Sequence, residues 1–150
     1  ILNYLLSLSK TPLSDDMVEA VDDLFNTVND IERVGDHSEN IAELATIAIS
    51  ENLDLSDESV KEIKHMYDLV FENFSSSLRL IDEKNSFLAN EILEREDEVN
   101  KIEKSIRVNH IYRLNNRNCG IDSGILYIDL ISNLERISDH CANIAKRVIE

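Results

Sequence analysis

Hydrophobic residues recur along this chain at intervals of three and four, which is the spacing of one face of an α-helix. The first long stripe of this kind runs from Met17 to Ala48. Ser14 stands just before it, where an N-cap is expected, and two aspartates follow in the first turn, where the helix dipole favours anions. The pattern predicts one long amphipathic helix over residues 14–52.

Three further stripes of the same period predict three more helices, over residues 56–85, 86–116 and 123–150. Ser56 and the two acids after it mark the start of the first of these, and residues 118–120 separate the last two. Connections of a few residues between helices this long imply antiparallel neighbours. The predicted fold class is therefore an all-α, up-and-down helical bundle.

Two stretches, 30–42 and 133–145, are copies of one motif. They read DIERVGDHSENIA and NLERISDHCANIA, with seven of thirteen positions identical at an offset of 103. The identities fall on charged and amide positions, which amphipathicity does not dictate. A repeated helix usually marks a repeated supersecondary unit, so we expect two related three-helix units. The first, over residues 1–55, is truncated: its opening helix is absent, and residues 1–10 are the tail of its second. Residues 56–150 form the complete second unit.

Each copy of the motif places two carboxylates four residues apart on one helix face. The pairs are Glu32 with Asp36 and Glu135 with Asp139. Like charges at this spacing repel each other, whereas a hard or borderline cation would bind both. The third of the long helices adds Glu96 and Glu103 beside its apolar stripe, where a bundle would pack. We predict metal half-sites here; a solvated acidic face is the alternative in a chain with thirty acids.

The other polar residues of the motif have structural interpretations. Arg33 and Arg136 are expected to form salt bridges to the acidic helix over residues 86–116. His37 and His140 are expected to be buried, hydrogen-bonded histidines rather than ligands. Gly35 is expected to mark a close approach of two helices, because glycine in a helix interior costs about 1 kcal/mol relative to alanine.

Composition excludes several classes of function. Thirty Asp and Glu against fifteen Lys and Arg give a net charge of −15, which repels nucleic acid and anionic membrane surfaces. Cys119 and Cys141 are too few for a disulfide framework, and Cys141, on an apolar stripe, is expected to be a buried, reduced thiol. No apolar run approaches the length of a membrane span, so we expect no direct membrane insertion by this segment.

The sequence lacks the motifs of common enzyme chemistries. A ferritin-like di-iron site needs an E-x-x-H motif on each of two helices, and this sequence offers one, from Glu62 to His65. A Gly-rich phosphate loop, a G-x-S-x-G elbow and an H-E-x-x-H motif are all missing. The sequence therefore predicts a protein that is not an enzyme.

The repeated motif resembles the hallmark of the PhoU domain family, which reads close to E-R-x-G-D-H-x-x-N-I-A. The matching stretches are 32–42 and 135–145, the second with Ser138 in place of glycine. Residues 94–103 are similar to the family's second helix. Residues 110–120 look like the version fused behind bacterial sodium-dependent phosphate cotransporters.

This resemblance implies a regulatory domain in phosphate homeostasis that binds transition metal ions, iron or zinc, sometimes as clusters. Two departures from the family pattern bear on the site. Asn100 stands where an acid would pair with Glu96, and Lys146 replaces the acid found at Glu43 in the first copy. Carried over by position, the implied metal ligands are Glu32, Asp36, Glu96, Glu103, Glu135 and Asp139.

The resemblance also implies a partner and a location. We expect the cytoplasmic part of a membrane-spanning phosphate transporter, in the same polypeptide or separate, tethered at the inner face of the cell membrane. A homo-oligomer is left open. Two alternatives remain: a free-standing PhoU-type regulator of phosphate uptake, and a purely structural helical module without metal. The chain does not begin with Met, and we expect it to be part of a longer protein.

Overall fold

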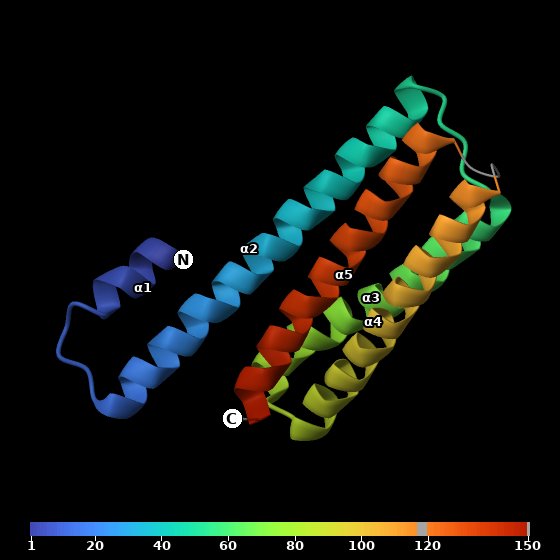
Figure 1. Ribbon diagram of the computed structural model, residues 1–150. Coiled ribbons are helices and arrows are strands. Elements are labelled where there is room, and N and C mark those ends of the chain that lie inside the picture. Colours follow the sequence, from blue (N-terminus) through green and yellow to red (C-terminus); the bar gives the residue numbers. More distant parts are fainter. Residues whose placement is uncertain (117–119, 150) are drawn as a thin grey trace.

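A computed structural model describes residues 1–116 and 120–149, and five helices lie within these ranges (Figure 1). The predicted all-α class is confirmed, and the four long helices begin and end within about two residues of the predicted bounds. A short helix precedes them in the segment expected to be the tail of a helix. The helices are α1 (Leu2–Leu8), α2 (Asp15–Ser50), α3 (Asp57–Glu83), α4 (Ser86–Asn115) and α5 (Ile121–Ile149).

Short polar residues set the helix starts. The Ser56 hydroxyl accepts a hydrogen bond of 3.2 Å from the backbone N–H of Ser59 and caps α3. The Asn85 side chain caps α4 in the same way, by accepting from the first amides of that helix. Between them Lys84 adopts a left-handed conformation with φ of 44°, which reverses the chain so that α4 runs back along α3. Ser14 is the N-cap residue of α2, but its side chain makes no capping bond.

Helix α5 lies at the centre of the arrangement. Helices α2, α3 and α4 all pack against it, and α3 and α4 also pack on each other. In the described part of the chain, α2 packs on α5 and α1 alone. Figure 1 shows α2 along one side of α5, the α3/α4 pair on the other, and α1 standing apart from the bundle beside α2.

The hydrophobic core fills the space between α3, α4 and α5. Most of its side chains come from these three helices, α2 adds Val34, and the burial of each large aliphatic side chain contributes about 1.5–3 kcal/mol. Helix α5 contributes the most buried residues because it is covered on three sides. The largest fully buried side chains are Tyr127, Met66, Leu80, Ile92, Ile106, Ile131 and Val99.

The apolar stripe of α2 is buried far less than its pattern predicts. Met17 is 57% exposed and Leu24 is 48% exposed, while Asp30 and Val34 are the buried residues of this helix. The physical reason is that α2 has neighbours on few sides, since it packs on α5 and α1 among the described elements.

A buried polar cluster fixes α3 against α4 and α5. The Asn73 side-chain amide donates to the Ser138 hydroxyl at 3.0 Å and to the carbonyl oxygen of Ile92 at 3.3 Å, and its oxygen accepts from Arg95 at 3.0 Å. Ser138 is the repeat counterpart of Gly35. The expectation of a close helix approach at Gly35 is wrong, because a Cβ there would meet no atom of the described chain within 4 Å.

Cys141 is fully buried on α5, as expected, and burial raises the pKa of its thiol to about 11.

Thiol labelling tests this burial. Cys119 lies outside the described residues, so a Cys119→Ser variant isolates the buried thiol. We expect a bulky aromatic disulfide to label this variant at least about 100-fold more slowly when folded than in urea, because labelling requires opening of the helix packing. Absorbance of the released thiolate gives both rates, and comparable rates would contradict the packing of α5.

Candidate functional site

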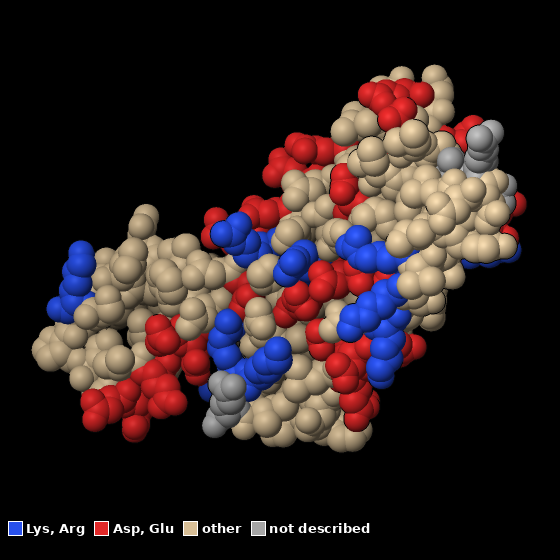
Figure 2. Space-filling model, in the orientation of Figure 1, with Lys and Arg blue, Asp and Glu red and all other residues tan. Residues whose placement is uncertain are grey.

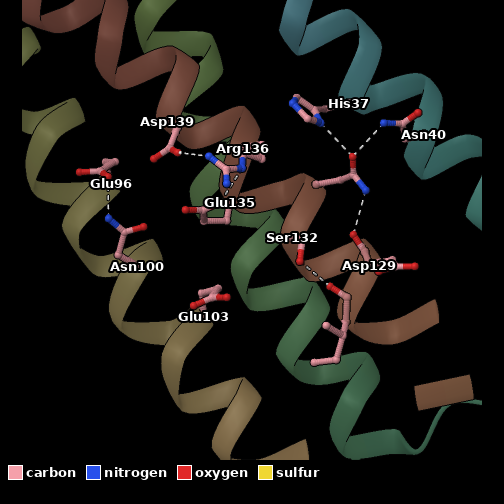
Figure 3. A network of polar contacts seen from close by, with 12 residues as sticks. His37, Asn40, Glu96, Asn100, Glu103, Asp129, Ser132, Glu135, Arg136 and Asp139 are labelled. Carbon is pink, nitrogen blue, oxygen red and sulfur yellow. Dashed lines mark hydrogen bonds and ion pairs between the residues drawn. The ribbon is translucent and has the colours of Figure 1, made fainter. Parts of the chain in front are cut away.

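The acids of α4 and α5 face each other across the seam between the two helices (Figure 3). Glu135 and Asp139 project from α5, and Glu96 and Glu103 lie opposite on α4 with Asn100 between them. All four carboxylates are half-buried rather than fully exposed. Packing thus places four of the six predicted ligands along one seam; we call Glu96, Glu103, Glu135 and Asp139 the acidic row.

The charges of the acidic row are close enough to act on one another. The pKa of Glu135 is raised, first by burial and then by the negative charge of Asp139, with further contributions from Glu103 and Glu96. Arg136 opposes the rise but does not cancel it. The fold therefore holds Glu135 in a place where its ionised form is disfavoured.

The two arginines of the motif pair along their own helices. Arg136 contacts Glu135 at 3.6 Å and Asp139 at 3.4 Å, and Arg33 contacts Asp36 at 3.5 Å. The prediction of salt bridges to the acidic third long helix, α4, is therefore wrong. A partner one turn away needs no helix crossing, and α2, which carries Arg33, does not pack on α4.

Groups of α4 hold the remaining acids of the row. The Asn100 amide donates to Glu96 at 2.6 Å, and Arg107 donates to Glu103. Arg107 also donates to the Ser132 hydroxyl of α5 at 2.9 Å, so it spans the seam. Figure 2 shows the result on one face of the molecule, where acidic and basic side chains intermingle in spite of the net charge of −15.

The structure separates the other two predicted ligands from the acidic row. Glu32 and Asp36 lie on an exposed face of α2, where Asn29 and Arg33 are their neighbours in a shallow hollow. In residues 1–116 and 120–149, no three His, Cys, Asp or Glu side chains are gathered as a metal site requires. The acidic row fits a cation in donor chemistry and in charge, since carboxylate and amide oxygens suit hard ions. Binding would exchange the pairing with Arg136 and Asn100 for the ion.

The histidines of the motif join α2 to α5. Nδ1 of His37 lies 2.9 Å from the side-chain oxygen of Asn133, and Nδ1 of His140 lies 2.8 Å from Asp30 (Figure 3 shows the first pair). The two rings stack with centroids 5.7 Å apart. The prediction of hydrogen-bonded histidines is confirmed, although both are half-buried. We call these reciprocal contacts the α2/α5 joint, because each repeat's histidine reaches the first motif residue of the other.

Sequence reasoning missed the role of Asp30, the most strongly bonded residue of the joint. Asp30 is buried and accepts from His140, from Asn143 at 3.4 Å and from Arg147. The repeat counterpart of Arg147 is Leu44, so this ion pair exists on one side of the joint only. The spacing of an Asp or Asn seven residues before His in both copies is the signal that could have revealed these contacts.

A second ion pair, largely buried, holds Glu62, the acid of the isolated E-x-x-H sequence. Glu62 accepts from the Tyr127 hydroxyl at 2.5 Å and from Arg113 at 2.8 Å. Burial raises the pKa of Glu62, but these hydrogen bonds outweigh it, so the pKa is lowered overall. The same burial and the Glu62 charge raise the pKa of Tyr127. Glu62 therefore ties α3 to α4 and α5 and takes no part in the acidic row.

Comparison with known proteins matches residues 1–45 and 63–148 to the PhoU domain family. The chain is 31% identical over 121 residues to the phosphate-specific transport system accessory protein PhoU homolog 1 of Thermotoga maritima, covering 81% of this chain and 51% of that protein. It is 26% identical over 145 residues to the corresponding PhoU homolog of Streptococcus pneumoniae, covering 97% and 65%. The chain thus spans about half to two thirds of these relatives.

Solved structures share the fold. The crystal structure of PhoU from Pseudomonas aeruginosa superposes with a TM-score of 0.87 at 22% identity, covering 97% of this chain and 68% of that one. The phosphate transport system regulatory protein PhoU from Streptococcus pneumoniae gives 0.84 at 23%, covering 99% and 68%. The accessory and regulatory names of these proteins agree with a role other than catalysis.

None of the described helices combines the length and apolarity that a membrane crossing needs.

Replacing Glu135 by glutamine should stabilise the chelator-treated protein. A carboxyl with a raised folded pKa contributes its full stability below its ordinary pKa and loses it as the pH rises through the folded value. At pH 7 we expect Glu135→Gln to raise the Tm by about 1–3 °C, and the gain to vanish towards pH 4. Circular dichroism melts measure both.

The matched control is Glu32→Gln, the repeat counterpart on the exposed face of α2, which should leave the Tm unchanged. A lower Tm for Glu135→Gln would show that the contact with Arg136 outweighs the repulsion within the acidic row.

Proposed function

We propose that this chain, which belongs to the PhoU domain family, is a metal-binding regulatory module of a phosphate-specific transport system. One observation carries the proposal: packing sets the second copy of the repeated motif against the acids of α4, in a row where burial and then mutual repulsion raise the pKa of Glu135. The names of the relatives supply the connection to phosphate transport. The chain covers only part of those proteins, so its substrate system and its partner both belong to the proposal.

The acidic row would hold the cation through its carboxylates, with the Asn100 side chain as an oxygen donor beside them. A donor set made entirely of oxygen suits iron or manganese better than zinc, which more often takes nitrogen and sulfur ligands. A bound cation would supply the positive charge that the row lacks. Glu32 and Asp36 form a second half-site in this proposal, on the other repeat.

Regulation by such a module works through contact. Glu135 and Asp139 belong to α5, which packs on every other long helix, so a change in their charge acts on the packing of the bundle. A partner that reads the shape of the bundle would respond to that change. We propose a membrane-spanning phosphate transporter as this partner and the cytoplasmic face of the membrane as the place of contact.

Two forms of the protein are compatible with this role. The resemblance of residues 110–120 favours the domain fused to a sodium-dependent phosphate cotransporter. Of these residues, 117–119 lie outside the described part of the chain. The relatives reported above are named as accessory or regulatory PhoU proteins, and they support a separate accessory protein better. We therefore propose the separate regulator first and the fused domain second. The next experiment distinguishes both forms from the remaining alternative, a purely structural helical module that binds no metal.

Elemental analysis tests metal binding directly. We expect protein purified without chelator to carry iron, manganese or zinc near one ion or more per chain, measured by mass spectrometry. The double variant Glu135→Ala, Asp139→Ala should lose metal from the acidic row. The matched double variant Glu32→Ala, Asp36→Ala should retain that part of the metal, because these residues lie on a different face. Metal-free wild type, or equal metal content in wild type and the Glu135/Asp139 variant, would contradict the proposal.

A further inference from the structure

One side of α4 is covered by no other described element. Helices α3 and α5 pack on the other sides of α4, and α2 lies across the bundle from it (Figure 1). Phe87 stands near the start of this uncovered side, and Val108, Ile111 and Tyr112 stand near its end; all four are more than half exposed. Large apolar side chains exposed along one side of a helix indicate a contact surface.

Charged residues of opposite sign lie between these apolar ends. Glu94 and Asp97 come first along the helix, and Lys101 and Lys104 follow. All four are exposed, and none of them forms an ion pair within the described part of the chain.

The charges of α4 that face its neighbours behave differently. Arg95 pairs with Glu72 of α3 at 3.3 Å, and Arg113 pairs with Glu62 of α3 at 2.8 Å. The covered sides of α4 thus find their ionic partners inside the bundle, whereas the uncovered side has its partners still to find.

The residues of the uncovered side recur at the a and d positions of a heptad repeat, which is the spacing of a helix that pairs with another helix. We call this row the outer face of α4 and define it by six residues: Phe87, Glu94, Asp97, Lys101, Lys104 and Ile111.

The order of charges on the outer face of α4 complements itself when two copies run antiparallel. In an antiparallel pair that crosses at the level of Val99, residues at equal numbers of positions before and after this level lie opposite each other. Asp97 then meets Lys101 of the second copy, and Glu94 meets Lys104 of the second copy.

The apolar ends of the outer face match in the same register. Phe87 meets Ile111 of the second copy, while Val108 meets Asn90 of the second copy. Two-fold symmetry makes every contact twice. A parallel pair would instead set each residue against its own copy, so that like charges would be juxtaposed at a cost in affinity.

We infer that the outer face of α4 is the contact surface between two copies of this chain in an antiparallel, two-fold symmetric dimer. One copy supplies both the acidic and the basic half of the pattern, so no other partner is required. The inference does not depend on metal binding, because the acidic row lies on the side of α4 that faces α5 (Figure 3).

The net charge of −15 opposes the association of two copies. At 0.15 M salt the Debye length is about 8 Å, so repulsion between distant charges is largely screened while ion pairs in contact still attract. Sedimentation velocity at this salt concentration, with chain at up to about 0.1 mM, should therefore show wild type in a monomer–dimer equilibrium.

Two charge-swap variants test the pairing. Lys101→Glu with Lys104→Glu makes the outer face wholly acidic, and Glu94→Lys with Asp97→Lys makes it wholly basic. Each variant alone should dimerise at least about tenfold more weakly than wild type, because every ion pair becomes a repulsion. An equimolar mixture of the two should dimerise again, because every opposed pair then has opposite charges.

The matched control is Lys61→Glu with Lys64→Glu on α3, which changes two exposed lysines of the same spacing and alters the net charge equally. It should dimerise as wild type does. All the substituted residues are exposed, and circular dichroism melts check that each variant folds.

Three results would overturn the inference. The first is a wild-type chain that stays monomeric over the whole concentration range. The second is a charge-swap variant that dimerises as wild type does, or a mixture of the two folded variants that stays monomeric. The third is an equal loss of dimer in the α3 control, because net charge would then explain the effect.

Discussion

The packing of α5 against three neighbours at once is the constraint on which the rest of the structure depends. Its motif residues divide among three sides: His140 bonds to α2, Ser138 and Cys141 face α3, and Glu135 and Asp139 face α4. A helix in this position has little free surface, so its polar residues must find partners on specific neighbours. This explains why charged and amide positions, rather than apolar ones alone, recur between the two copies of the motif.

In the acidic row, this packing holds carboxylates close together although they repel one another. Burial at the seam between α4 and α5 brings like charges together where water screens them less, and the raised pKa of Glu135 is the consequence. Arg107 and Asn100 of α4 and Arg136 of α5 offset part of this repulsion by pairing with the carboxylates. The chain's own groups neutralise this arrangement incompletely, which is why we propose it as a cation site.

Helix periodicity was enough to predict the bundle and its four long helices, and to place Glu96 and Glu103 beside the apolar stripe of α4, because each depends on spacing along one helix. Contacts between helices were harder. The partners of Arg33 and Arg136 depend on which helices cross, and the openness at Gly35 depends on what covers α2. The Asp30 contacts needed the relative placement of two repeats 103 residues apart, which no local pattern contains.

The most direct test of the central claim, that the acidic row is a cation site held under repulsion, is the melting temperature measured with increasing Mn²⁺ or anaerobic Fe²⁺. Binding to the folded state at a hundredfold excess over Kd stabilises by about 2.7 kcal/mol. The account predicts a saturable rise in Tm of about 5–10 °C at pH 7. The rise should reverse with chelator and shrink as the pH falls towards 4, because protons compete for the carboxylate oxygens. A Tm that metal and chelator leave unchanged at pH 7 would contradict it.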